Sequence, residues 1–130
     1  MINQRLRDAL APTGTLRAGI NLSNFLLVSG QNTDGTPAGV SPDLARHIAA
    51  ILDVPCQFVA FETPGQLADA ATDDVWDICN IAHEPERARL IDFSQPYVLI
   101  DAHFLVRADS PFTSNEEIDQ PNVKIAAFYR

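Results

Sequence analysis

The sequence has no long apolar run and few basic residues, and each absence narrows what the protein can do. No stretch reaches the roughly 18 consecutive apolar residues that favour a membrane-spanning helix. The 9 Lys and Arg residues are outnumbered by 17 Asp and Glu residues, which gives a formal net charge of −8. Because nucleic acids and anionic membranes attract basic surfaces, this balance predicts no nucleic-acid partner and no anionic membrane partner.

The N-terminus also lacks the continuous apolar segment of a secretory signal. Ile2, Leu6, Ala9 and Leu10 have instead the spacing of a short amphipathic helix, which we expect over residues 2–11. Two alternatives follow. Either a signal peptide has been removed from this sequence, or the protein stays inside the cell.

The sequence has only two cysteines and no group of three residues spaced as metal ligands. Cys56 and Cys79 both fall in predicted apolar strands, where a thiol behaves as a small hydrophobic side chain, so we interpret both as core residues. Asp101 and His103 lie on one side of a predicted strand, but two ligands without a third do not make a metal site. The sequence therefore predicts no metal site and no cofactor.

The order of the predicted elements favours an α/β fold. The 130 residues, 46% apolar and 20% charged, fit a soluble domain with its own core. Strands are expected at residues 16–20, 56–61 and 78–82. One helix between them begins with Ser41 as its N-cap, and another begins at a Thr63–Gln66 capping box. Strands that alternate with helices predict a mostly parallel sheet with right-handed crossovers.

Polar residues follow two of these strands. The third strand breaks into the charged turn His83–Arg87, and the ligands of open α/β sheets bind at such strand ends. Asn24 and Phe25 come soon after the first strand. They either contact a ligand, with the aromatic ring covering it, or belong to a solvated turn.

The C-terminal part carries weaker patterns. Residues 98–106 alternate as a strand with one wetter side, and Ser114–Glu117 is a capping box for one helical turn. Residues 123–128 have the composition of a further strand.

Several motifs resemble those of the family-3 bacterial solute-binding proteins. Leu16–Asn21 is similar to the family's opening strand, and Gly39–Ala45 to its Gly-Phe-x-x-Asp-Leu-Ala helix start. Trp76–Val98 resembles its signature, in which an apolar strand and a turn precede Pro-x-Arg and Phe-Ser-x-Pro-Tyr. The resemblance implies a three-layer α/β/α lobe of a type II periplasmic binding protein. It also implies that the strands with Cys56 and Cys79 flank the first strand, about 9–10 Å apart, too far for a disulfide.

The resemblance also implies a binding site. In the family, the Arg that is here Arg87 holds the carboxylate of the solute, with polar groups at the strand end that are here Asn80 and His83. A guanidinium at a helix start can grip a carboxylate with two hydrogen bonds. As an alternative, Arg87 pairs with Glu84 or Asp92 at the surface. The candidate ligand-binding residues are therefore Asn24, Phe25, Asn80, His83 and Arg87, and no catalytic residue is predicted.

Some features depart from the family pattern. The turn is about two residues short, and Glu84 stands near the usual Ser or Thr. There it would repel an α-carboxylate unless it is turned away or pairs with Arg87. No Gly follows Gly65, although the family's second lobe usually carries a Gly-bearing loop. We therefore expect residues 1–106 to form the first solute-binding lobe. Residues 107–130 would then form the crossover and first strand of a second lobe that is largely missing.

The expected function is that of the solute-binding component of an ABC-type uptake transporter. Its partners would be a small polar or amino-acid-like solute and a membrane permease, and its location the periplasm, with the cytoplasm as the alternative. We expect no enzyme activity. Alternatives are a fragment of a cyclohexadienyl or arogenate dehydratase, which shares the fold, and a non-catalytic sensor or assembly module. We also expect residues 107–130 to pair with a second copy as a homodimer.

Overall fold

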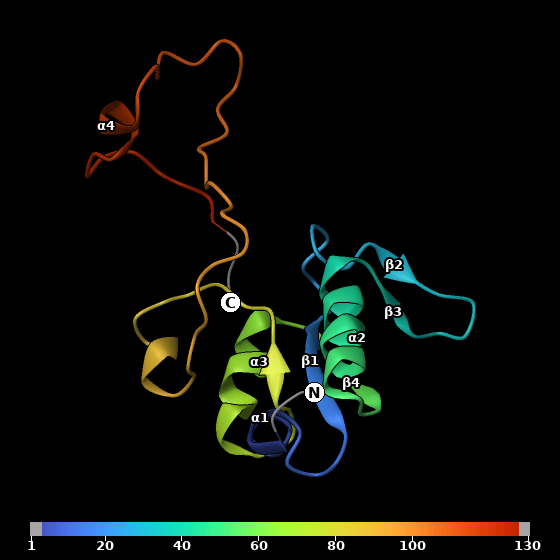
Figure 1. The fold of residues 1–130 in the computed structure, drawn as a ribbon. Helices are drawn as coiled ribbons and strands as arrows, with labels where there is room; N and C mark the ends of the chain where they lie inside the picture. Colours follow the sequence, from blue (N-terminus) through green and yellow to red (C-terminus); the bar gives the residue numbers. More distant parts are fainter. Residues whose placement is uncertain (1–3, 128–130) are drawn as a thin grey trace. The chain divides into compact units, whose positions relative to one another are not determined.

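The computed structural model describes residues 4–127 (Figure 1). The chain divides into two compact units, residues 1–93 and 94–130, and each is taken by itself. The predicted N-terminal helix is present as α1, Gln4–Leu10, and the start predicted for it at residue 2 lies outside the described residues. Among the helices that the structure describes, none is long and apolar enough to span a membrane.

A three-stranded parallel sheet is the centre of the first unit. Its strands are β1 (Leu16–Asn21), β4 (Cys56–Phe61) and β5 (Ile78–Cys79), in the order β4-β1-β5. β1 pairs with β4 from Leu16↔Cys56 onward, and Gly19 pairs with Cys79 of β5. The predicted parallel α/β fold is therefore confirmed, although the predicted strand 78–82 shortens to two residues.

The two faces of β1 contact different helices, which gives three layers. Leu16, Ala18 and Ile20 alternate along β1 and pack in clusters with buried Ala and Leu residues of α2 (Val40–Leu52). Gly19 points the other way, toward α3 (Pro64–Asp69). A Cβ atom on Gly19 would lie 2.5 Å from Leu67 Cδ1, so the missing side chain lets α3 approach the strand. Figure 1 shows α2 and α3 on either side of β1.

The start of α2 differs from its prediction. Gly39, not Ser41, is the N-cap residue, and no side chain caps this helix. Ser41 lies inside the first turn, where it is buried and its backbone N–H donates to Leu27 O. The prediction of Ser41 as a cap was wrong because tertiary contacts claim its polar groups. The start of α3 is as predicted, since Thr63 Oγ1 accepts from the N–H of Gln66.

Short elements complete the first unit. β2 (Gly30–Gln31) and β3 (Pro37–Ala38) form an antiparallel hairpin through the Asp34–Gly35 turn. The 3₁₀ turns η1 (Ala70–Thr72) and η2 (Arg87–Arg89) follow α3 and β5.

An ion-pair cluster ties the lead-in of β5 to β1. Arg17 Nη2 lies 2.6 Å from Asp77 Oδ1 and 2.8 Å from Asp74 Oδ1. The backbones of Arg17 and Asp77 also join this cluster, since Arg17 N–H donates to Asp77 Oδ2 and Asp77 N–H donates to Arg17 O. Hydrogen bonds to Asp77 and Asp74 raise the pKa of Arg17 further. The cluster fixes the register at which β5 enters the sheet.

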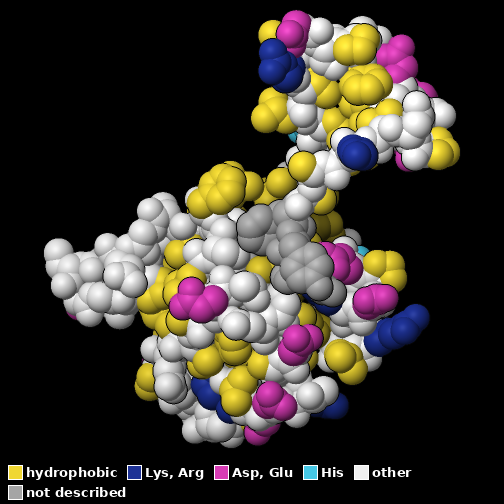
Figure 2. Space-filling view, turned by 180° about the vertical axis from the view of Figure 1, so that it is seen from behind, with side chains coloured by type: hydrophobic (Ala, Val, Ile, Leu, Met, Phe, Trp, Pro, Cys, Tyr) yellow, Lys and Arg dark blue, Asp and Glu magenta, His cyan; other side chains and the backbone are white. Residues whose placement is uncertain are grey.

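The second unit has little regular structure in its described residues. Its helix is α4 (Asn115–Ile118), which starts with the predicted Ser114–Glu117 capping box. The predicted strand 98–106 does not form, nor does a strand at 123–127, while residue 128 lies outside the described residues. The prediction was wrong because alternation sets the faces of a strand but does not supply a neighbour with which its backbone can pair. Large apolar side chains stay exposed in this unit (Figure 2): Tyr97, Val98, Leu99, Ile100, Phe104, Leu105, Val106 and Ile125.

Candidate functional site

Three of the five candidate residues follow the carboxyl ends of β1 and β5. β1 ends at Asn21 and β5 at Cys79, and the two strands are parallel neighbours. Asn24 and Phe25 follow the first of these ends, and Asn80 follows the second directly. Parallel strands share their carboxyl edge, so these residues leave the sheet on the same side.

The N-terminal turn of α2 lies at this edge too. Asn80 Nδ2 donates to Ser41 Oγ over 2.9 Å, across a sequence separation of 39 residues. This bond fixes the Asn80 amide against the helix start. Ser41 was not predicted as a site residue, because the sequence indicated for it only the role of a helix N-cap.

The loop after β1 is shaped by Asn21. This residue is buried, and its Oδ1 accepts from the N–H of Ser23 at 3.1 Å and from Ser23 Oγ at 2.8 Å. Asn24 O accepts from the N–H groups of Leu27 and Val28, which closes the turn. The turn leaves the side chain of Phe25 81% exposed. An exposed aromatic ring beside polar groups can cover an apolar part of a bound solute.

Arg87 is the buried cation of the site, with 7% of its surface exposed. Its Nη1 donates to Ala82 O at 3.1 Å and pairs with Glu84 Oε1 at 2.9 Å. Its Nε is buried and has no hydrogen-bond partner among the described residues. The alternative partner Glu84 is thus the one found, although Arg87 lies inside the protein and not at its surface.

His83 contacts a different neighbour. Its ring meets the Phe93 ring edge to face, with centroids 4.8 Å apart and an interplanar angle of 71°. No hydrogen bond or ion pair joins any two of the five candidate residues in the described part of the chain. The topology therefore places Asn24, Phe25 and Asn80 at one edge, and His83 and Arg87 follow in the turn after β5. Their joint contact with a solute stays a prediction.

The two cysteines lie on the strands that flank β1, and both are free. Burial raises the pKa of the Cys79 thiol to about 11, and burial also raises that of Cys56. A thiol with a raised pKa stays protonated and is a poor nucleophile near neutral pH. The expected position of the cysteines on the two strands that flank β1 is confirmed. Both are partly buried, and Cys56 packs against the two core clusters, whereas Cys79 belongs to neither of them.

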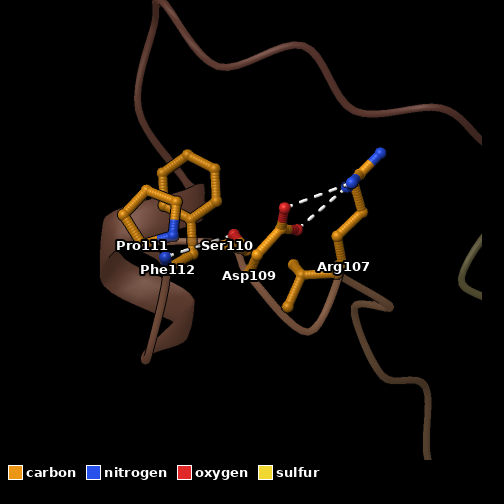
Figure 3. A pocket seen from close by; sticks show the side chains of 6 residues that line it. Arg107, Asp109, Ser110, Pro111 and Phe112 are labelled. Carbon is orange, nitrogen blue, oxygen red and sulfur yellow. Dashed lines mark hydrogen bonds and ion pairs between the residues drawn. The ribbon is translucent and has the colours of Figure 1, made fainter.

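One hollow of about 390 Å³ is present in the second unit, where it is lined by Val106, Arg107, Asp109, Ser110, Pro111 and Phe112 (Figure 3). Its charged groups, Arg107 and Asp109, pair with each other at 2.9 Å and are mostly exposed. The hollow is an open turn of consecutive residues and contains none of the predicted site residues. No three His, Cys, Asp or Glu side chains of the described residues gather as metal ligands would.

Comparisons with known proteins agree with the fold. The model of the bacterial extracellular solute-binding proteins, family 3, matches residues 16–126. An ancestral cyclohexadienyl dehydratase is 30% identical, with a TM-score of 0.60 over 71% of this chain and 38% of that one. An ancestral cationic amino acid solute-binding protein is 28% identical, with a TM-score of 0.60 over 72% of this chain and 41% of that one. A second structure, described as an amino-acid-binding precursor of cyclohexadienyl dehydratase, gives the same values.

The chain thus spans about 40% of the length of these solved structures. No curated protein matches it.

Proposed function

Because the chain belongs to the bacterial extracellular solute-binding proteins of family 3, we propose that it binds a small polar or amino-acid-like solute for an ABC-type uptake transporter. In this role it has no catalytic activity, works in the periplasm and passes the solute to a membrane permease. Two structures of one ancestral relative, described as a cationic amino acid solute-binding protein and as an amino-acid-binding protein, support the solute class.

The buried Arg87 carries the proposal. A guanidinium that is 7% exposed, in the turn that follows a parallel strand, is costly unless it serves packing or binding. Its Nε has no partner among the described residues, so the internal contacts do not use its full donor capacity. A guanidinium is the group that best recognises a planar anion, such as a carboxylate.

A thermal-shift screen of the full-length chain with amino acids, polyamines and other small polar solutes tests this function. A bound solute raises the unfolding temperature by mass action. Arg87→Met keeps an unbranched apolar stem but loses the guanidinium and its charge, and should weaken binding of any stabilising solute by roughly tenfold or more. Arg89→Met, which removes an exposed cation of the same turn, is the matched control and should bind like the wild type.

Unchanged binding by Arg87→Met would contradict the site. A screen in which no solute stabilises the wild-type protein would contradict the function.

The similarity to an ancestral cyclohexadienyl dehydratase supports a second candidate, a dehydratase-like activity. Incubation with arogenate or prephenate, followed by chromatography of the products, separates the two functions. We expect no aromatic product from the chain, and formation of one in proportion to protein concentration would establish the enzymatic alternative.

A further inference from the structure

We propose that Glu84 is an internal competitor for the carboxylate of a solute at Arg87, and so selects which solutes the site accepts. The inference rests on the proposed solute-binding function and adds a specificity-determining residue to it. Internal acceptors already occupy some of the N–H donors of Arg87.

A guanidinium can grip a carboxylate along two edges. The side edge uses Nε with Nη2, and the end edge uses Nη1 with Nη2. In Arg87, Nε is buried, and Nη1 already serves Ala82 O and Glu84 Oε1. Burial therefore closes the side edge, and the end edge lacks a free Nη1 while Glu84 stays in place.

The charges point the same way. The Glu84 carboxylate neutralises Arg87 at 2.9 Å, and its side chain is 46% exposed, whereas that of Arg87 is 6% exposed. An incoming carboxylate therefore meets the negative partner at the surface before it meets the buried cation. Because the pair is neutral overall, Arg87 offers no net positive charge to the carboxylate, while the half-exposed Glu84 carboxylate can attract an ammonium group.

The geometry thus assigns to the site a preference for solutes that bring a neutral or cationic polar group to Arg87 and Glu84. Solutes that bring a carboxylate must displace Glu84. The neighbouring Glu86 is also acidic, but its side chain is exposed and makes no ion pair with Arg87.

The test compares amino acids with the amines that lack only their carboxylate: L-arginine with agmatine, L-lysine with cadaverine, and L-phenylalanine with phenethylamine. Glu84→Gln removes the charge but keeps an oxygen acceptor for Nη1, so Arg87 retains a hydrogen bond. The full-length variant should bind the amino acids roughly three- to tenfold more tightly than the wild type, with no such gain for the amines. Glu86→Gln removes the same charge two residues along the turn and should leave all affinities unchanged.

Circular dichroism checks that each variant keeps its fold, and isothermal titration calorimetry gives the affinities. If the Glu84 and Glu86 variants bind the amino acids with equal affinity, the competitor role of Glu84 is contradicted. The proposed function would still stand in that case, provided that the wild-type protein binds any of the six compounds. If none of the three proteins binds any of the six compounds or any solute of the wider screen, both the competitor role and the function are contradicted.

Discussion

The guanidinium of Arg87 is buried and has few hydrogen-bond acceptors among the described residues. A buried N–H without an acceptor costs about 1–3 kcal/mol, and Arg87 Nε is such a group among the described residues. The pair with Glu84 and the bond to Ala82 O offset part of the cost of burying the cation. Buried polar groups that are incompletely satisfied are typical of functional sites, which agrees with the role proposed for Arg87.

Cys79 makes stability depend on pH in the alkaline range. Its thiol ionises near pH 9 when exposed, and burial raises its pKa in the fold to about 11. Between these values the unfolded chain loses the proton first, so the free energy of unfolding should fall as the pH rises from 9 to 11. The loss is at most about 2–3 kcal/mol.

Urea unfolding at pH 8, 9, 10 and 11 measures this dependence, and Cys79→Ala is the comparison. The variant loses packing at every pH, but its stability should fall less steeply above pH 9 than that of the wild type. Parallel pH curves for the two proteins would contradict the assignment to Cys79.

At the scale of the elements, Gly39 decides whether α2 can start where it does. Its φ of 131° lies in the region that glycine favours, and a Cβ atom there would lie 2.6 Å from Leu27 O and 2.8 Å from Ser29 N. The φ of Gly35 is also positive, at 80°, but a Cβ atom at that position would meet nothing within 4 Å.

Gly39→Ala should therefore destabilise the protein by at least about 3 kcal/mol, because backbone overlap adds to conformational strain. Gly35→Ala should cost only about 1–2 kcal/mol, from strain alone. Urea unfolding gives the free energy of unfolding of both variants. Equal losses of stability would show that the backbone atoms around Gly39 do not exclude a Cβ atom.

The elements also show which features of the fold could be predicted from sequence. The order strand-helix-strand-helix-strand was readable because periodicity and the Thr63 cap are local signals. The position of Ser41 was not readable, since its hydrogen-bond partner Asn80 is far away in the sequence. Residues 98–106 have a strand pattern but no strand, because pairing depends on a neighbour that the pattern does not specify.

In the candidate site, too, local features could be predicted from the sequence, whereas contacts that depend on packing could not. Strand ends predicted that Asn24 and Asn80 lie at one edge, but the burial of Arg87 depends on packing that no spacing reveals. Glu84 was one of two partners considered for Arg87, and the structure identifies it by geometry.

For the whole molecule, residues 107–130 are predicted to pair with a second chain. Ile125 is half exposed, and the described residues 123–127 form no strand. The N–H of Val123 donates to Gln120 O, and the following residues up to 127 can offer their backbone groups for edge pairing. Sedimentation velocity should show association of the full-length chain at high concentration, whereas a chain that ends at Val106 should stay monomeric.

The shortened chain should remain folded, because its two core clusters are built from buried residues between Ala11 and Leu52. Circular dichroism and cooperative urea unfolding check this. A full-length chain that is monomeric at high concentration would show the pairing prediction to be wrong.

The strand order β4-β1-β5 has a consequence for the order in which the protein can be made. A ribosome produces the central strand β1 first, yet both of its neighbours come later, and the last pairing needs Cys79. Until then Leu16, Ala18 and Ile20 have no complete sheet to hold them, so the growing chain passes through a long interval with its most buried strand unprotected. Folding of this unit is therefore late relative to synthesis, which gives a molecular chaperone time to bind the apolar segment.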